Sequence, residues 1–375
     1  MKKYFVILSI SVLFIACGRV GDEDRLTISG VPVASSGNIM FDVRSKSQLV
    51  TKNGTNYDDK GHYSMLVQSK DKNDNPIGYL SDFTYELFEN GSKSSQGESK
   101  VIFNEDTRPT TNKILLLLDF SGSLIGDCDR VNSFENENNL CYQLIESAKQ
   151  FIDDTVTQKQ TMAIYYFNSK KNIMPLSDTA TPTSDKIKLK NGLSKLYDSK
   201  FRADYLEGYN STNLNGAVIE ATKIACLWVG CNDGVYQPVN DANFESFEFA
   251  SIVVFTDGRD LAKRIDKIDM LNFISKYEDL YYYSIGLGDV DTNTLKSIGR
   301  DRYIPVKQNS DLDGAFDDLS IQIKSWGESF YKVDYCPASQ EGSVDIKIEV
   351  ENDNYYGVIS DIIKLPENID FRCDL

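Results

Sequence analysis

The chain has 375 residues, of which 41% are hydrophobic and 11% aromatic, and its formal net charge is −16. A chain of this length and composition can bury the core of one α/β domain and those of smaller modules. The acidic balance argues against nucleic acid as a partner, because phosphates would be repelled, and favours cations or partners that carry basic patches. His62 is the single histidine, which disfavours Ser-His-Asp catalysis and multi-histidine zinc sites.

The N-terminus is typical of an export signal. Lys2 and Lys3 precede an apolar stretch, residues 4–16, that is too short to span a bilayer comfortably. We therefore expect residues 1–16 to be a signal peptide.

The end of this stretch resembles a bacterial lipobox, in which cleavage precedes a cysteine that is then lipidated. Cys17 is that cysteine here, although Phe14 stands where such signals usually have leucine. Gly18 follows, without an acidic residue that would indicate retention in an inner membrane. The resemblance implies an exported protein, anchored by Cys17 and a short tether (17–24) to the outer membrane or cell surface. An ordinary signal peptide, cut nearby, is the alternative.

The cysteine count agrees with export. Seven cysteines minus Cys17 leave six, an even number that is typical of disulfides in an exported protein. Proximity in the sequence favours the pairs Cys128 with Cys141, Cys226 with Cys231, and Cys336 with Cys373. A metal site is the alternative, but the paired CxxC spacing that would indicate it is missing.

Residues 25–110 are predicted to form a β-sandwich-like module. Segments 26–34, 38–45, 62–69, 82–89 and 100–105 alternate apolar and polar side chains, and the stretches between them are rich in turn residues. The part around Asn75, Pro76 and Ile77 resembles the immunoglobulin-like module of many exported bacterial proteins.

The pattern changes at residue 111, and residues 111–325 are predicted to form an α/β domain. Strands alternating with amphipathic helices imply a mostly parallel sheet flanked by helices. The short polar connection 168–171 predicts an antiparallel hairpin at one edge. The expected strands are 113–119, 161–167, 172–177, 251–256, 280–286 and 302–306. The expected helices lie near 138–157, 184–197, 213–228, 260–276, 292–299 and 311–325.

Residues 326–375 return to a β pattern. Segments 330–336, 344–352 and 355–365 alternate again, and helix signals are missing. These strands either form a unit of their own or complete the N-terminal sandwich. The second arrangement is favoured, because two incomplete sheets would leave open edges.

A run of five apolar residues, 114–118, ends abruptly at Asp119 and is typical of a strand that is buried on both faces. Ser121 and Ser123 follow at intervals of two. Ligands bind at the carboxyl edge of open α/β sheets, and hard oxygen donors without thiol or imidazole suit Mg²⁺.

Two later segments carry further oxygen donors. Thr212 stands at the start of the helix near 213–228, and Asp257 ends the apolar strand 251–256. Because parallel strands end on the same edge of a sheet, Asp119 and Asp257 are expected to converge there, with Thr212 beside them.

The order of these residues resembles the metal-ion-dependent adhesion site (MIDAS) of a von Willebrand factor A (vWA) domain: D-x-S-x-S, then a threonine, then an aspartate. The resemblance implies a Rossmann-like fold that binds Mg²⁺ or Mn²⁺. It implies direct ligation by Ser121 and Ser123, and direct or water-bridged contacts from the other members, which are Asp119, Thr212 and Asp257. A long loop, 124–139, departs from the family pattern. A capped turn with an incidental Asp257 is the alternative interpretation.

The resemblance implies a binding protein rather than an enzyme. We expect a lipid-anchored envelope protein in which a partner protein's carboxylate completes the coordination of the metal. One alternative is a structural component of an envelope complex, with a metal that only rigidifies a loop. The other is a phosphohydrolase with Asp119 as nucleophile, but such enzymes typically have a second acid where Ser121 stands, and a lysine motif or histidine base is not evident.

Overall fold

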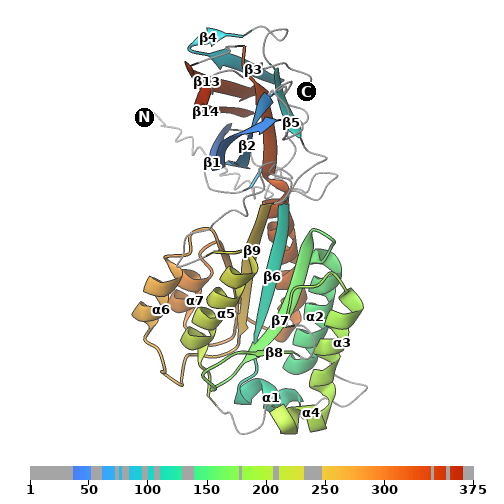
Figure 1. The fold of residues 1–375 in the computed structure, drawn as a ribbon. Coiled ribbons are helices and arrows are strands. Elements are labelled where there is room, and N and C mark those ends of the chain that lie inside the picture. The colour runs from blue at the N-terminus through green and yellow to red at the C-terminus, as the bar shows by residue number, and fades with distance from the viewer. Residues whose placement is uncertain are drawn as a thin grey trace, which may run out of the picture.

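The computed structural model consists of a β unit and an α/β unit stacked end to end (Figure 1). The signal peptide, the tether and the strand 26–34 predicted from the sequence lie outside the described residues. Among the described residues, no helix has the length and apolar character needed to cross a membrane. The structure describes residues 37–51, 61–71, 76–77, 84–94, 100–104, 110–128, 139–176, 180–205, 211–231, 247–338, 342–351 and 355–365.

The α/β unit is built on a six-stranded sheet in the order β11-β10-β9-β6-β7-β8. Neighbouring strands are parallel, except that β8 runs antiparallel to β7, as the short connection predicted. Counted within this unit, the order is 3-2-1-4-5-6, the doubly wound arrangement. The strands are β6 (Thr110–Asp119), β7 (Gln160–Phe167), β8 (Met174–Pro175), β9 (Phe247–Thr256), β10 (Tyr281–Leu287) and β11 (Arg302–Val306).

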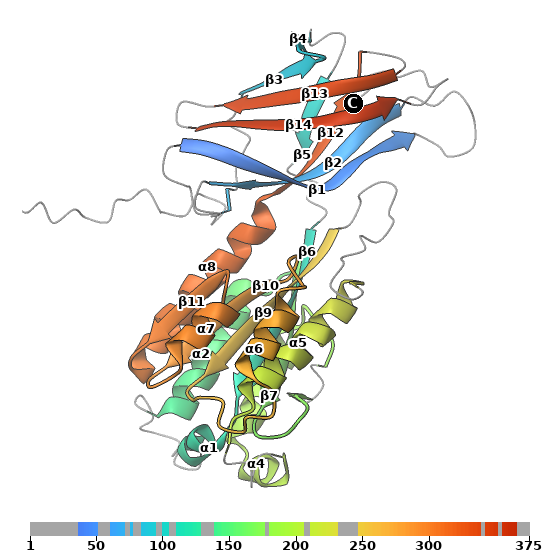
Figure 2. The ribbon, with the colours of Figure 1, turned by 90° about the vertical axis from the view of Figure 1, so that its left-hand side faces the viewer.

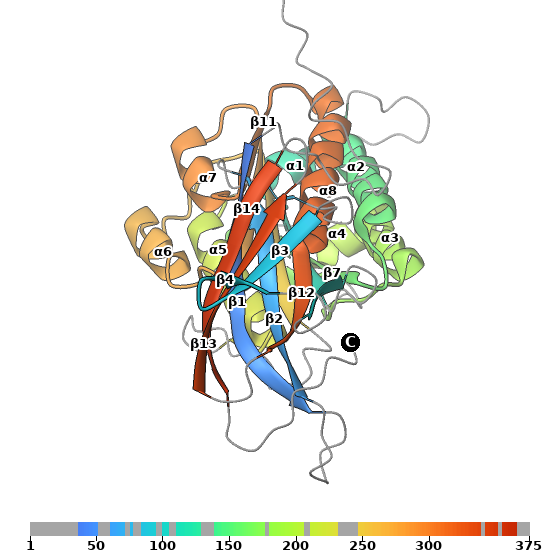
Figure 3. The same ribbon diagram turned by 90° about the horizontal axis from the view of Figure 1, so that it is seen from above.

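Helices cover both faces of this sheet. In Figure 3, α2, α3 and α8 lie on one side and α5, α6 and α7 on the other. The predicted fold class, a mostly parallel sheet flanked by helices with β segments before and after it, is therefore confirmed. The helices are α1 (Gly122–Cys128), α2 (Leu140–Thr155), α3 (Lys186–Ser194), α4 (Ser199–Tyr205), α5 (Leu214–Trp228), α6 (Lys267–Ile274), α7 (Thr292–Ile298) and α8 (Leu312–Glu328), with 3₁₀ turns at Lys195–Tyr197 and Asn309–Asp311.

The unbroken apolar run of β6 is explained by this double cover. Ile114, Leu116 and Leu118 belong to the core on the α2–α8 side, and Leu115 and Leu117 belong to the core on the α5–α7 side. All five side chains are fully buried. A strand with only one buried face would alternate with polar residues, so the run itself indicates two helical layers.

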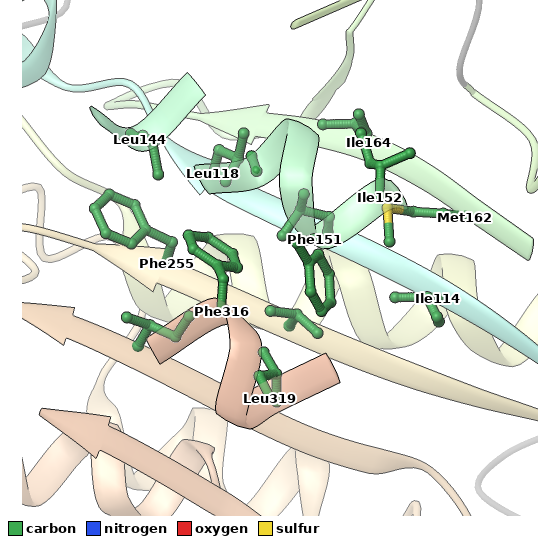
Figure 4. Close-up of a cluster of buried hydrophobic side chains, with 14 of the residues drawn as sticks. Ile114, Leu118, Leu144, Phe151, Ile152, Met162, Ile164, Phe255, Phe316 and Leu319 are labelled. Atoms are coloured by element: carbon green, nitrogen blue, oxygen red, sulfur yellow. The ribbon is translucent and has the colours of Figure 1, made fainter. Parts of the chain in front are cut away.

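In the core on the α2–α8 side, large apolar side chains of both helices pack onto those of the sheet (Figure 4). Phe151 of α2 and Phe316 of α8 have ring centroids 5.4 Å apart, and both rings pack onto the sheet. Burial of each such side chain contributes about 1.5–3 kcal/mol relative to exposure.

The β unit combines strands from both ends of the chain. The order is β4-β3-β13-β14-β1-β2-β12-β5, so β12 lies between two N-terminal strands and β13 joins β3 to β14. The domain bounds themselves stay a prediction. The strands are β1 (Gly37–Thr51), β2 (Gly61–Lys70), β3 (Thr84–Glu89), β4 (Ser92–Lys93), β5 (Lys100–Asn104), β12 (Phe330–Cys336), β13 (Gly342–Glu351) and β14 (Tyr355–Leu365).

Side chains from both parts of this sheet share one core. Met65 and Val333 of β2 and β12 belong to the same buried cluster as Ile346 and Ile359 of β13 and β14. The start of β1 pairs in parallel with β14, and the rest of it pairs antiparallel with β2. One long strand therefore passes from one part of the sheet to the other.

The two units meet in a buried polar seam, which we define as Gln68, Ser69, Tyr281 and Ser329. Gln68 Nε2 donates to Tyr281 Oη and to Ser329 Oγ, both at 3.2 Å. The backbone N–H of Ser69 donates to the carbonyl of Ser329 at 2.9 Å. The β unit therefore lies at the amino ends of β6 and β9, and the carboxyl ends point the other way (Figure 2).

Candidate metal centre

The predicted site residues lie at the carboxyl ends of β6 and β9. Asp119 is the last residue of β6, and Asp257 follows the last residue of β9. The two strands are adjacent and parallel, with Leu118 opposite Phe255. The chain continues from β6 to one side of the sheet and from β9 to the other, so the site lies at the topological switch point, where doubly wound folds bind ligands.

Asp119 is fully buried, and the polar groups around it hold both of its carboxylate oxygens. Oδ1 accepts a hydrogen bond from the backbone N–H of Ser121 at 3.0 Å. Oδ2 accepts from the hydroxyl of Thr256 at 2.6 Å. These bonds fix the orientation of the carboxylate before any ion arrives.

Thr212 reaches the same place from the loop before α5. A Cβ atom built on Gly258 would lie 3.4 Å from Thr212 Oγ1 and 3.9 Å from Asp119 Oδ2, so both oxygens face the same small space. The loop that carries Thr212 is fixed on both sides. The carbonyl of Thr212 accepts a hydrogen bond from the N–H of Ala262 at 3.0 Å. The N–H of Asn213 donates to the carbonyl of Asn168 at 2.9 Å.

The remaining predicted ligands are placed less completely. Ser121 is buried, and its backbone N–H forms the hydrogen bond to Asp119 that is described above. Ser123 lies in the first turn of α1, and its side chain is outside the described part of the structure. The structure thus places Ser121 in contact with Asp119 and turns Thr212 toward the same small space. Asp257 lies close enough for its charge to act on Asp119.

The pKa of Asp119 is raised by its surroundings in the site. Burial, followed by repulsion from the carboxylate of Asp257, raises this pKa from 3.8 to about 7, against the lowering effect of the hydrogen bonds from Thr256 and Ser121. Two carboxylates in a buried space destabilise each other when both are ionised. A cation between them removes this repulsion.

The donor set fits a hard divalent cation. It contains carboxylate and hydroxyl oxygens, the ligands that Mg²⁺ and Mn²⁺ prefer. Within the described residues, no group of three or more His, Cys, Asp or Glu forms a cage for a metal. The set includes two carboxylates, those of Asp119 and Asp257, so an ion held here would still attract water or an outside ligand.

Sequence reasoning missed Thr256. Its hydroxyl binds Asp119 and also accepts a hydrogen bond from the N–H of Gly258 at 3.1 Å, so it joins the ends of β6 and β9. The signal was present: Thr256 is a polar residue at the end of an apolar strand, directly before the predicted ligand Asp257.

The structure also differs from the sequence prediction in the region after Ser123. Part of the predicted loop 124–139 is helical, because α1 extends over Gly122–Cys128 and buries Leu124 and Cys128 in the core. The short helix α4 was not predicted either. Residues 129–138 lie outside the described structure.

Two of the three predicted disulfides are present. Cys128–Cys141 ties α1 to the first turn of α2, and Cys226–Cys231 closes the C-terminal end of α5. Cys336 is also disulfide-bonded, while Cys373 lies outside the described residues.

No family model matches the sequence, and no curated protein matches it. Solved structures do match. Proximal thread matrix protein 1 from the mussel byssus is 13% identical, with a TM-score of 0.39 over 62% of this chain and 49% of that one. VWA2, the ArnB paralog of Sulfolobus acidocaldarius, is 14% identical, with a TM-score of 0.38 over 89% and 79%. BatB from Bacteroides thetaiotaomicron is 14% identical, with a TM-score of 0.38 over 58% and 99%.

The chain spans about half the length of the mussel protein, which has also been solved with a zinc-occupied MIDAS motif. At these identities and TM-scores, the similarities identify neither a family nor a function. The fold of this chain is therefore defined by its own strand order, and the candidate site by the contacts of Asp119.

Proposed function

We propose that the α/β unit is a vWA domain whose adhesion site holds Mg²⁺ or Mn²⁺ and binds a carboxylate of a partner protein. The observation that carries the proposal is the convergence of Asp119, Ser121 and Thr212 at the switch point of the sheet, beside the charge of Asp257. The D-x-S-x-S, threonine and aspartate order of the sequence supports the same assignment.

Each residue has a defined part in this proposal. Asp119, held by Thr256 and the Ser121 N–H, supplies an oriented negative charge, and Asp257 supplies the second. The hydroxyls of Ser121, Ser123 and Thr212 supply neutral oxygens. When bound, the ion supplies a positive centre that attracts an outside carboxylate. Few direct carboxylates leave that centre electron-poor, which favours binding of a negatively charged group.

The position of the site suits a protein tethered at its N-terminus. Gly37, the first described residue, lies in the β unit, whereas the site lies at the opposite end of the α/β unit (Figure 2). We propose that Cys17 carries the lipid anchor of an exported envelope protein. With that anchor, the β unit would face the membrane and the metal site would face away from it.

A pull-down from envelope extract tests this function. The immobilised chain is incubated with Mg²⁺ or with a chelator, beside the variants Asp119→Ala and Asp318→Asn, the latter an exposed residue of α8. We expect a partner that is retained only with Mg²⁺, by the unmutated chain and by Asp318→Asn. Partner binding that survives chelator and Asp119→Ala would contradict the proposal and favour a purely structural metal.

The proposal includes no enzymatic step. Asp119 is fully buried, and the residue two positions on is Ser121 rather than the second acid that such phosphohydrolases typically have. Turnover of generic phosphoesters that disappears in Asp119→Asn would contradict this part of the proposal.

A further inference from the structure

Two members of the candidate metal site, Thr212 and Asp257, belong to separate loops. Thr212 precedes α5, and Asp257 follows β9. An ion that is held by both residues needs the two loops in a fixed relative position, because ligands that are poorly oriented bind a metal weakly. The contacts between these loops therefore bear on the affinity of the site.

Asp260 links the loop after β9 to the start of α5. Its Oδ1 accepts a hydrogen bond from the backbone N–H of Leu214 at 3.1 Å, and its Oδ2 accepts from Asn215 Nδ2 at 2.8 Å. The N–H of Ala262 adds a third bond between the two segments, to the carbonyl of Thr212 at 3.0 Å. Both oxygens of Asp260 are thus bonded to the residues that directly follow Thr212.

The bond to Leu214 takes the place of the usual helix cap. Asn213 is the N-cap residue of α5, but its side chain makes no capping hydrogen bond and donates to the carbonyl of Lys170 instead. Leu214 and Asn215 are both buried, so without Asp260 a backbone N–H and a side-chain amide would lose a partner away from water. Asp260 therefore caps α5 from a distant part of the chain.

The backbone of the same segment turns sharply where it meets α5. Lys263 has a φ of +47°, in the left-handed region that residues other than glycine rarely adopt. Such a conformation costs free energy and persists only where surrounding contacts hold it. The bond between the neighbouring Ala262 and Thr212 is one such contact.

We infer that Asp260 is a positioning residue of the metal site, which fixes Thr212 relative to Asp257 and acts on the ion through Thr212. The inference rests on the proposed function. Both oxygens of Asp260 accept hydrogen bonds from the start of α5, whereas Thr212 Oγ1 faces the small space beside Gly258. The part of Asp260 is therefore to orient a ligand.

Calorimetric titration of Mn²⁺ into Asp260→Ala tests the inference. We expect the affinity to fall roughly tenfold or more, the usual effect of removing a group that orients a ligand. Asp260→Asn keeps an oxygen for the N–H of Leu214 and should recover most of this loss.

The matched control for charge is Asp266→Ala. Asp266 is an exposed acid of the same segment, and its side chain makes no capping hydrogen bond to α6. This variant should bind Mn²⁺ as tightly as the unmutated chain. A loss as large as that of Asp260→Ala would mean that net charge explains the effect, and would overturn the inference.

A double-mutant cycle with Thr212→Ala separates positioning from a general loss of structure. If Asp260 acts through Thr212, then Asp260→Ala should change the affinity by less than about twofold in a chain that already carries Thr212→Ala. Additive losses would overturn the inference. Asn215→Ala, which removes the bond to Asp260 Oδ2, should show the same lack of additivity and replaces Asp260→Ala if that variant does not fold.

Hydrogen exchange in chelator tests the link without the ion. The amides of Leu214 and Ala262 should be protected in the unmutated chain and in Asp266→Ala, and should lose protection in Asp260→Ala. Unchanged protection in Asp260→Ala would overturn the inference.

The outcomes separate the inference from the proposed function. Equal affinity of Asp260→Ala and the unmutated chain for Mn²⁺ overturns the inference alone. Failure of the unmutated chain to bind Mn²⁺ overturns the proposed function, and the inference with it.

Discussion

Asp119 carries an electrostatic cost in the metal-free site. Its carboxylate is fully buried and lies close enough to Asp257 for the two charges to repel each other. The hydrogen bonds from Thr256 and Ser121 offset only part of this cost. In the metal-free protein, the residue that prepares the site for a cation is therefore also a source of instability.

This cost predicts a pH dependence for the metal-free protein. The pKa of Asp119 is raised from 3.8 to about 7, so the folded state binds this proton more tightly than the unfolded state. The resulting stability is fully present below about pH 4 and is lost as the pH rises through 7, a change on the order of a few kcal/mol. Thermal unfolding in chelator should show this loss, and Asp119→Asn should reduce it. An equal pH dependence in the variant would contradict the prediction.

Gly258 permits a second prediction at the scale of one residue. In Gly258→Ala, the new methyl group would contact Thr212 Oγ1 and Asp119 Oδ2 at ordinary van der Waals distances, so the fold is kept while the space between the oxygens is filled. We expect the affinity for Mn²⁺ to fall roughly tenfold or more, by about 1.4 kcal/mol.

The matched control for Gly258→Ala is Gly126→Ala in α1. A Cβ at that position meets no atom within 4 Å. This change should leave the affinity for Mn²⁺ unaltered and stabilise the helix by about 0.5–1 kcal/mol. Calorimetric titration measures both variants. Unchanged affinity in Gly258→Ala would show that the ion does not occupy this space.

At the scale of elements, α7 and β10 approach each other closely. Gly299 ends α7 against this strand, and a Cβ there would lie 2.3 Å from Ser284 Oγ and 2.5 Å from the carbonyl of Arg302. The carbonyl of Arg302 is part of the backbone, so it cannot move away from an added Cβ as a flexible side chain could. This close approach holds the start of β11 against the end of the helix.

We therefore expect Gly299→Ala to destabilise the fold by about 1–3 kcal/mol, the usual cost of overpacking. Urea unfolding, followed by circular dichroism, measures the change. Gly314→Ala in α8 is the control, because a Cβ there meets no atom within 4 Å. Equal stability of the two variants would mean that α7 can move away from β10 at little cost.

The sequence was most informative where an element is long and buried on both faces. The apolar runs of β6 and β9 indicated parallel strands, and their acidic ends indicated the site, because strand direction alone brings such ends together. The short helices α1 and α4 were missed, although α7, which also has seven residues, was predicted. Seven residues make only about two helical turns, so the apolar period alone does not decide such an element. The polar side chain of Thr256 at the end of β9 marked its position, but its partner, Asp119, lies 137 positions away in the sequence, so the role of Thr256 was missed.

At the scale of the whole molecule, the seam connects the two units. Gln68 is fully buried. Its amide donates hydrogen bonds to Tyr281 of β10 and to Ser329, which lies between α8 and β12. A buried amide that loses its partners is costly, so the seam favours one relative orientation of the units. The candidate metal site lies at the far end of the sheet from this seam.

We predict that the intact chain unfolds in one thermal transition and that Gln68→Ala lowers its stability by about 2–3 kcal/mol. The variant should bind Mn²⁺ as tightly as the unmutated chain, because the seam lies at the other end of β6 and β9. Gln150→Ala, on the exposed face of α2, is the control for stability. A large loss of metal affinity in Gln68→Ala would show that the seam and the site are coupled.

Calorimetric titration of Mn²⁺ and Mg²⁺ into the unmutated chain tests the central claim, that oxygen side chains from separate parts of the chain hold one divalent ion. We predict saturable binding of one ion per chain, which is lost in Asp119→Ala and strongly weakened in Thr212→Ala and Asp257→Ala. Failure of the unmutated chain to bind either ion, or equally tight binding by Asp119→Ala, would contradict the account.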